Sequence, residues 1–489
     1  MAVVAVSSFV SLLFVALISI YLVASENRDF GGAVFSVNSK FYGNERSLGV
    51  LKAHDSLRFS HLKILASGVD FHIGGIGRLD DVGLYYAKIG IGTPPREYYV
   101  QVDTGCDIMW INCIDCQDCP KKGYHGLDLT LYDRELSLTG KPVMCDEEFC
   151  REINGGTVNG CKANVPCLYT EIYGDGSESI GSFVKDAIQY DSVSGDFETK
   201  MATGSVVFGC GANQTGNLAS SEEAFDGILG FGKSNSSVVS QLASYGKVKK
   251  MFAHCLDGDN GGGIFAIGHV VQPKVNSTHL IQDEPHYAVN VTGIEVGTEC
   301  LNLSTDSYGR GEKRKAIIDS GTTLAYLPKV IYKPLMDKIV EGWSDMISIL
   351  QDQYTCFKFS GSVDYKFPAV TFHFENSLSL KVYPHDYLFV LEDFLCFGWQ
   401  NNDIDPVSSS DTIVLGDLVL SNKLVLYDLE NQTIGWTEYN CSSSIMLRDE
   451  ATGSVHLVGA HSITSACSRI IYSPVMFLLL IALLNLIMS

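Results

Sequence analysis

The stretch Val102–Asp107 (VDTGCD) has a counterpart in the second half of the chain, Ile318–Thr323 (IDSGTT). Each stretch places one aspartate, Asp103 or Asp319, at the end of an apolar, β-branched run that is typical of a buried strand. A small hydroxyl residue and a glycine follow, and the glycine permits a tight turn. One such motif is ordinary turn chemistry. Two copies at the same place in two halves predict a repeated fold in which each half contributes one carboxylate.

A second motif repeats in the same order. The first half contains Phe225–Gly230 (FDGILG) and the second contains Ile413–Asp417 (IVLGD), so two apolar residues and a glycine follow each aspartate motif. This order resembles the pepsin-like aspartic peptidases over roughly residues 84–441. The cysteines after the first motif resemble the plant branch of nepenthesin-like and GPI-anchored enzymes. The resemblance implies an all-β, bilobal fold with a cleft between two related lobes and a few short helices.

The resemblance also implies an aspartic endopeptidase that hydrolyses peptide bonds in proteins or peptides. Asp103 and Asp319 are the expected catalytic pair. Because two like charges in one site cannot both ionise cheaply, such a pair shares one proton. The ionised carboxylate activates a water and the protonated one donates to the scissile carbonyl, which favours acid pH. We expect a monomer whose mechanism needs no metal, no cofactor and no covalent intermediate.

Several residues match supporting positions of the family. Gly105 and Gly321 allow backbone N–H groups to approach the carboxylates, and Thr322 matches a hydroxyl that orients the second aspartate. Cys106 departs from the pattern, because the family usually has a serine here whose hydroxyl bonds the catalytic carboxylate. A thiol is a weaker donor, so Cys106 is compatible with weakened catalysis. The alternative is a disulfide from Cys106 to one of the cysteines in Cys113–Cys119.

The segment Tyr169–Ser177 predicts a β-hairpin with a turn rich in glycine and aspartate. It resembles the flap of the family, which closes over a bound peptide, and Tyr173 matches the flap tyrosine. Trp110 matches the tryptophan whose indole N–H steadies that tyrosine. On chemistry alone, Trp110 is equally well explained as a core residue. The alternative for Tyr173 is an ordinary strand residue, which the order of the motifs disfavours.

Composition limits the class of protein. The chain has 489 residues, of which 46% are hydrophobic and 19% charged, so it is long and apolar enough for two domains with cores. This balance excludes a disordered chain. The net charge of −21 argues against nucleic acid as a partner, since no basic block offsets it.

Fifteen cysteines indicate an oxidising compartment. Cys113, Cys116 and Cys119 recur at a spacing that also suits zinc, but no histidine is paired with them at ligand spacing, so we favour disulfides. The family resemblance implies that Cys356 pairs with Cys396. Seven asparagines begin N-glycosylation sequons, which agrees with a secretory route: Asn213, Asn235, Asn276, Asn290, Asn302, Asn431 and Asn440.

The amino-terminal part of the chain predicts two processed segments. Residues 1–24 are apolar, with no charged side chain before Glu26, and predict a signal peptide; a signal anchor is the alternative. Residues 25–80 intersperse basic and apolar side chains and resemble the family's own propeptide, which lies over the cleft. The alternative is a plain N-terminal extension. We expect the lobes at residues 81–267 and 268–441, with a flexible joint at Gly74–Gly77.

The carboxyl-terminal part predicts a membrane attachment. Residues 442–465 are small and polar and predict a stalk, whereas residues 466–489 end inside their own apolar run without a following Lys or Arg. This pattern suits a GPI signal better than a transmembrane helix. Ser465 is the expected attachment site, and Gly459 begins a second candidate. We therefore expect a glycoprotein of the secretory pathway, held at the outer face of the plasma membrane by a GPI anchor.

Two alternatives without proteolysis remain. One is a peptide-binding relative, similar to the plant xylanase-inhibitor proteins built on this fold, which usually lose a catalytic motif. The other is a GPI-anchored surface glycoprotein. Because both aspartate motifs, the flap segment and a propeptide-like segment are all present, the sequence favours the enzyme.

Overall fold

The computed structural model describes residues 68–77, 83–162, 164–219, 224–303, 314–341, 349–351, 354–402, 411–450 and 452–463. The predicted signal peptide, most of the propeptide-like segment, Ser465 and the apolar tail lie outside these residues. Strands dominate the described part, and its longest α-helix is α5, Lys329–Ile339. The prediction of an all-β fold with a few short helices is confirmed.

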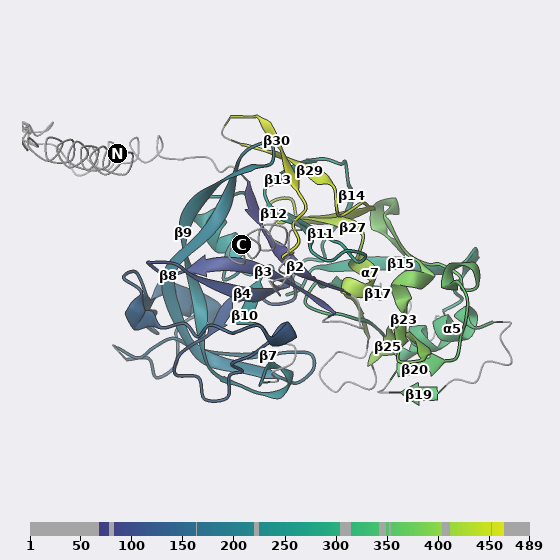
Figure 1. Cartoon of the computed structure of the whole chain (residues 1–489), viewed down its shortest axis with the longest axis horizontal. Helices are drawn as coiled ribbons and strands as arrows, with labels where there is room; N and C mark the ends of the chain where they lie inside the picture. The colour runs from purple at the N-terminus through teal and green to yellow at the C-terminus, as the bar shows by residue number, and fades with distance from the viewer. Residues whose placement is uncertain are drawn as a thin grey trace, which may run out of the picture. The chain divides into compact units, whose positions relative to one another are not determined.

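Four sheets contain the described strands, and the largest has 15 strands. Its members are β1 (Val69–Phe71), β2 (Ile73–Ile76), β3 (Leu84–Ile91), β4 (Arg96–Asp103), β5 (Trp110–Asn112), β6 (Lys141–Pro142), β7 (Leu168–Ile172), β8 (Glu178–Gly195), β9 (Glu198–Gln214), β10 (Gly227–Gly230), β11 (Met251–Leu256), β12 (Gly263–Ile267), β14 (Asn276–His279), β27 (Lys423–Asp428) and β28 (Thr433–Glu438). Strands β8 and β9 pair along almost their whole length and form a prominent ribbon (Figure 1).

The second lobe is built on a sheet of eight strands and a smaller sheet of four. The eight are β15 (Ala288–Val296), β16 (Glu299–Cys300), β17 (Arg314–Ile318), β18 (Ala325–Leu327), β21 (Val370–Phe374), β22 (Ser379–Val382), β25 (Trp399–Asn401) and β26 (Thr412–Leu415). The four are β19 (Ile349–Gln351), β20 (Tyr354–Phe357), β23 (Leu388–Leu391) and β24 (Phe394–Phe397).

A third group of strands forms a separate sheet: β13 (His269–Gln272), β29 (Ser444–Arg448) and β30 (Val455–Gly459). The other α-helices are α3 (Glu148–Ile153), α4 (Val238–Ser244), α6 (Pro384–Tyr387) and α7 (Asp417–Leu420). Short 3-10 turns are η1 (Tyr124–Gly126), η2 (Arg134–Leu136), η3 (Gly216–Ala219), η4 (Val363–Tyr365) and η5 (Glu375–Ser377).

The two aspartate motifs occupy equivalent places in the two lobes. Strand β4 ends at Asp103 and pairs in parallel with β10, where Gly230 lies opposite Asp103. Strand β17 ends directly before Asp319 and pairs in parallel with β26, where Ile318 lies opposite Leu415. In each lobe, the apolar-apolar-Gly segment therefore forms the strand beside the aspartate, as the repeated order of motifs predicts.

Aromatic side chains pack beneath the aspartates and join the lobes. Tyr427 of β27 stacks on Phe252 of β11 with ring centroids 4.3 Å apart, and contacts Tyr287 at 4.6 Å. The Tyr287 hydroxyl donates to the carbonyl of Phe231 at 2.7 Å. Tyr427, Phe252 and Tyr287 are all fully buried. The apolar core is consequently continuous from one lobe to the other.

The structure corrects the predicted start of the first lobe at residue 81. Strand β1 pairs with β8 and β12, and β2 pairs with β3, so residues 69–76 belong to the main sheet. Gly74–Gly77, expected as a flexible joint, includes the end of strand β2. The sequence pattern missed these strands because both are short and β2 is rich in glycine.

The structure also corrects the predicted stalk at residues 442–465. Within it, β29 and β30 form a hairpin, and β29 pairs with β13 of the main body. Ile445, Leu447 and Val458 are buried against Ala253 and Ala266. These three apolar side chains attach the hairpin to the main body. The sequence analysis missed the hairpin because so few apolar residues in a polar segment form no recognisable pattern.

Disulfide bonds contain all three cysteines whose spacing is also compatible with a zinc site, Cys113, Cys116 and Cys119. Cys356 pairs with Cys396, as the family resemblance implies. The others join Cys113 to Cys210, Cys116 to Cys119, Cys145 to Cys161, Cys150 to Cys167 and Cys255 to Cys441. The last of these bonds ties the start of the hairpin segment to β11.

Replacing Leu447 by alanine should destabilise the protein, because Leu447 is 1% exposed and belongs to the apolar cluster under the hairpin. A buried Leu→Ala change costs about 2–5 kcal/mol. Thermal and denaturant unfolding would measure the loss. Met446→Ala, at a neighbouring position that is 37% exposed, is the matched control and should change little. Equal effects of the two substitutions would contradict the packing of this hairpin.

Candidate active site

Each aspartate is held by the turn that follows it. Asp103 accepts hydrogen bonds at Oδ1 from the backbone N–H of Gly105 (2.7 Å) and Cys106 (3.0 Å). Asp319 accepts at Oδ1 from the N–H of Gly321 (2.9 Å) and at Oδ2 from the Thr322 hydroxyl (2.6 Å). These bonds fix both carboxylates against rotation, and they come from the residues for which the sequence predicted supporting roles.

The two aspartates face each other across the lobes. A Cβ atom added to Gly105 would lie 2.8 Å from both carboxylate oxygens of Asp319, and one added to Gly321 would lie 2.2 Å from Oδ1 of Asp103. Distances this short do not occur for real Cβ atoms. Each glycine is therefore required so that its turn can approach the carboxylate of the opposite lobe.

Hydrogen bonds across the lobes hold this approach in place. The Ser320 N–H donates to the Thr104 hydroxyl at 2.9 Å, and the Ser320 hydroxyl donates to the Val102 carbonyl at 3.4 Å. The side chain of Gln101 donates to the Gly321 carbonyl at 3.2 Å. Thr104 and Ser320 are buried, so these bonds are shielded from water.

The predicted hairpin over the site is formed by β7 and β8. Tyr173 stands just after β7, where its N–H donates to the Ser177 carbonyl at 2.9 Å and closes the turn. The indole N–H of Trp110 donates to the Tyr173 hydroxyl at 2.6 Å. Trp110 is 2% exposed, so it packs in the core and also orients the tyrosine. The two alternative explanations of Trp110 are thus compatible with each other.

Comparisons with known proteins place the chain in a family. Two family models match it, described as xylanase inhibitor N-terminal over residues 85–269 and xylanase inhibitor C-terminal over residues 286–438. The chain is 47% identical over 450 residues to aspartic proteinase 36 of Arabidopsis thaliana, covering 92% of each protein. Aspartic proteinase 39 of the same plant is 46% identical over 434 residues, or 88% of this chain and 90% of the relative.

The chain belongs to the pepsin-like family of plant aspartic proteinases. Solved structures share its fold at low sequence identity. Conglutin gamma from lupine seeds has a TM-score of 0.60 at 18% identity, over 77% of this chain and 96% of that one. Basic 7S globulin from soybean has a TM-score of 0.58 at 17% identity, over 77% and 95%. Membership of the nepenthesin-like branch stays a prediction.

Burial changes the pKa of one of the two site carboxyl groups, that of Asp103. Removal of Asp103 from water raises the pKa of its carboxyl well above the ordinary value, and the neighbouring charge of Asp319 raises it further. The N–H groups of Gly105 and Cys106 act in the opposite direction but do not cancel the effect. A carboxyl with a raised pKa next to a second carboxylate is suited to hold the shared proton of a dyad.

Cys106 is a free thiol in this structure and is buried. Cys113, Cys116 and Cys119 bond to other cysteines, so the alternative of a disulfide from Cys106 to this run is wrong. Its Sγ donates to the Ile108 carbonyl at 3.3 Å and lies 3.7 Å from the Tyr173 hydroxyl. Burial, and next the charge of Asp103, raise the pKa of the thiol, so it stays protonated.

Glu171 is a site residue that the sequence analysis missed. It lies on β7, two residues before Tyr173 and thus on the same face of the strand. Burial raises the pKa of the Glu171 carboxyl to about 7, and the charge of Asp107 raises it further. The alternation of Tyr169, Glu171 and Tyr173 was the available signal, because it directs all three toward one side of the flap.

Asp417 is a second missed residue. It ends the IVLGD motif and begins α7, and its N–H donates to the Thr322 carbonyl at 2.8 Å. The side chain is fully buried, and neither carboxylate oxygen has a hydrogen-bond partner among the described residues. Burial raises the pKa of Asp417 well above its ordinary value, with further contributions from Asp319 and Asp103. Asp417 is therefore suited to stay neutral behind the second turn.

Cys106→Ser should increase hydrolysis at acid pH, because a serine hydroxyl is a better hydrogen-bond donor than the thiol beside Tyr173. A neutral hydrogen bond contributes about 0.5–1.5 kcal/mol, which corresponds to a gain of at most roughly tenfold in rate. Steady-state kinetics would measure this. Cys300→Ser, at the exposed free cysteine, is the control and should have no effect. A slower Cys106→Ser enzyme would show that the thiol is not merely a weaker serine.

Proposed function

We propose that this aspartic proteinase is an active endopeptidase that hydrolyses proteins or peptides at acid pH. The observation that carries the proposal is the close approach of each glycine to the opposite carboxylate, Gly105 to Asp319 and Gly321 to Asp103. The two aspartates are thereby near enough to act on one bound water. Family membership supports the same conclusion.

The proposed reaction uses the aspartate pair as general base and general acid. Asp103 and Asp319 together hold one proton, since desolvation and mutual repulsion disfavour a doubly ionised pair. The ionised carboxylate removes a proton from the water as that water attacks the scissile carbonyl carbon. The protonated carboxyl donates to the carbonyl oxygen and gives a tetrahedral intermediate. The carboxyl that received the water's proton then protonates the leaving nitrogen, while the other carboxylate takes a proton from a hydroxyl of the intermediate, so that the carbon–nitrogen bond breaks and the pair again holds one proton.

This mechanism sets the direction of the pH dependence. Activity requires one proton on the pair, so it falls as the pH rises through the pKa at which that proton is lost. Because burial raises the pKa of Asp103, this loss is displaced above the ordinary titration range of an aspartate. The flap, through Tyr173 and its bond to Trp110, would close over the bound peptide and exclude water.

We further propose that the chain passes through the secretory pathway and is anchored outside the cell by GPI. The disulfides of the described residues agree with an oxidising compartment. Most of the sequon asparagines are exposed and accessible to glycosylation: Asn235, Asn276, Asn302, Asn431 and Asn440. Asn213 and Asn290 are half-buried. The propeptide, the monomeric state and the anchor rest on the sequence pattern alone.

A second candidate function is binding without cleavage. The matched family models are described as xylanase inhibitor domains, and Cys106 replaces the usual serine beside the first aspartate. Such a protein would bind a partner through the same cleft without turnover. The presence of both aspartates in opposed, hydrogen-bonded positions favours the peptidase.

Asp103→Asn and Asp319→Asn should each abolish hydrolysis, because an amide of the same size cannot share the proton. The loss of general acid–base work is at least roughly 10²-fold. Cleavage of a denatured protein at acid pH, with circular dichroism to verify folding, would measure it. Asp337→Asn, on an exposed part of α5, is the matched control. Wild-type turnover in either dyad variant, or none in the wild type itself, would contradict the proposal.

Phosphatidylinositol-specific phospholipase C should release the protein from intact cells into the medium. The motivating observation is an apolar carboxyl terminus without a following Lys or Arg. Immunoblotting of medium and cells would follow the release, and a Ser465→Pro variant would test the attachment site. Retention on the cells together with recovery of a peptide from residues 470–488 would instead indicate a transmembrane helix.

A further inference from the structure

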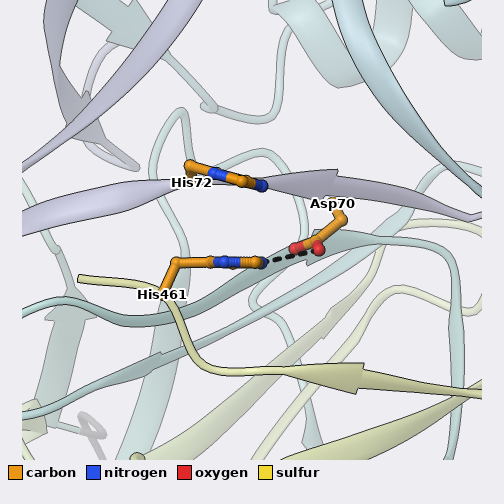
Figure 2. A group of neighbouring side chains, drawn as sticks. All are labelled: Asp70, His72 and His461. Carbon is orange, nitrogen blue, oxygen red and sulfur yellow. Dashed lines mark hydrogen bonds and ion pairs between the residues drawn. The ribbon is translucent and has the colours of Figure 1, made fainter. Parts of the chain in front are cut away.

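A cluster of potential metal ligands lies apart from the aspartate motifs, where the first and last described segments meet. Asp70 belongs to β1, His72 lies between β1 and β2, and His461 follows β30 (Figure 2). His461 is positioned by two backbone hydrogen bonds with Gly263, at 2.7 and 2.8 Å. Asp70 is fixed within the main sheet by pairing with β8 and β12.

The three side chains converge. The Nε2 atom of His461 lies 2.7 Å from Oδ2 of Asp70, and the rings of His461 and His72 stack with centroids 3.8 Å apart at 15°. Figure 2 shows both rings side by side with their outer edges toward the Asp70 carboxylate. One ligand atom from each of the three residues falls within 4.8 Å of the others.

A separate observation is that one buried oxygen atom of the cluster lacks a hydrogen-bond partner. Asp70 is 4% exposed, and its Oδ1 atom has no hydrogen-bond partner among the described residues. An unsatisfied buried carboxylate oxygen is costly, because it has lost water without gaining a donor or a cation. Asp191 adds negative charge nearby, with Oδ2 3.8 Å from Nε2 of His72. A bound cation would satisfy Asp70 and neutralise this charge.

We propose that Asp70, His72 and His461 form a binding site for one zinc ion. Two imidazoles and a carboxylate are ligands that zinc accepts, and a water completes the four-coordinate site. Zinc–ligand bonds of about 2.0–2.2 Å place tetrahedral ligand atoms about 3.4 Å apart. Small side-chain rotations bring the cluster to that spacing as zinc replaces the proton between His461 and Asp70.

The chemistry of the chain favours zinc over other divalent ions. Calcium and magnesium prefer oxygen ligands, whereas two of the three donors here are imidazole nitrogens. Ferrous iron also binds two histidines and a carboxylate. The disulfides indicate an oxidising environment, in which ferrous iron is not maintained. Zinc has no redox chemistry and is compatible with such surroundings.

Zinc binding requires neutral imidazoles, so the site should be occupied near neutral pH and vacated in acid. The charged or titratable groups that face His72 are His461, Asp70, Asp191 and Lys88. Protons therefore compete with zinc in the pH range where the proposed peptidase works.

Bound zinc would hold the end of the described chain against the first lobe. Just beyond His461, the N–H of Ile463 donates to the Ile73 carbonyl at 3.1 Å, and the Tyr86 hydroxyl donates to the Ile463 carbonyl at 3.2 Å. The metal would add a link between strand β1 and this segment. The aspartate dyad does not need the zinc ion. The role of the metal is therefore to stabilise the attachment of the segment around His461 to the first lobe.

Isothermal titration of the full, chelator-treated protein with zinc chloride tests the site. We expect one zinc-binding event per chain at about pH 7 that is lost at about pH 5. We expect zinc affinity to fall by at least roughly tenfold in each of His72→Ala, His461→Ala and Asp70→Asn. A loss of this size is typical even when the mutated residue only hydrogen-bonds to a metal ligand. His373→Ala is the matched control, because His373 Nε2 lies 3.3 Å from Oε2 of Glu295 but belongs to no cluster of three potential metal ligands among the described residues.

Two further measurements separate loss of ligation from loss of folding. Circular dichroism should show that His72→Ala, at a side chain 46% exposed, is folded like the wild type. Zinc should raise Tm and slow proteolytic removal of the segment after β30 in the wild type and in His373→Ala, but not in His72→Ala. Absence of zinc binding at about pH 7, unchanged binding in both histidine variants, or equal loss in the control would overturn the proposal.

Discussion

The structure depends on the close approach of two turns, in which Gly105 and Gly321 each lie against the carboxylate of the other lobe. Any Cβ atom at these positions would separate the aspartates. The approach is maintained by the buried bond from Ser320 to Thr104 and by the core that extends beneath both turns through Tyr427. The contact between the two turns therefore fixes the end of β4 against the residues that follow β17.

The elements that repeat in the sequence were predictable. Both aspartate strands, the parallel strands of the apolar-apolar-Gly segments, the flap hairpin and the bond between Trp110 and Tyr173 lie where the motifs indicate. Local patterns suffice here, because the residues that define each element are close together in the sequence. The environment of Cys106 needed the structure, since only the structure places its thiol between Ile108 and Tyr173.

Features that depend on distant contacts were not predictable. Asp70 and His461 are 391 residues apart, and no local pattern connects them. The strands β1 and β2 are too short, and the β29–β30 hairpin too polar, to be recognised without the surfaces that bury them. Asp417 stood within a quoted motif, but its complete burial without a partner is a property of the folded chain.

The pairing of β27 with β11 has a consequence for folding during synthesis. Strand β11 lies between β12, which is translated soon afterwards, and β27, which begins at Lys423. Until the ribosome has made β27, one edge of β11 has unpaired N–H and C=O groups and can pair with another chain. The first lobe therefore cannot complete its sheet while it is being translated. Early exposure of this edge makes the nascent chain dependent on protection from aggregation.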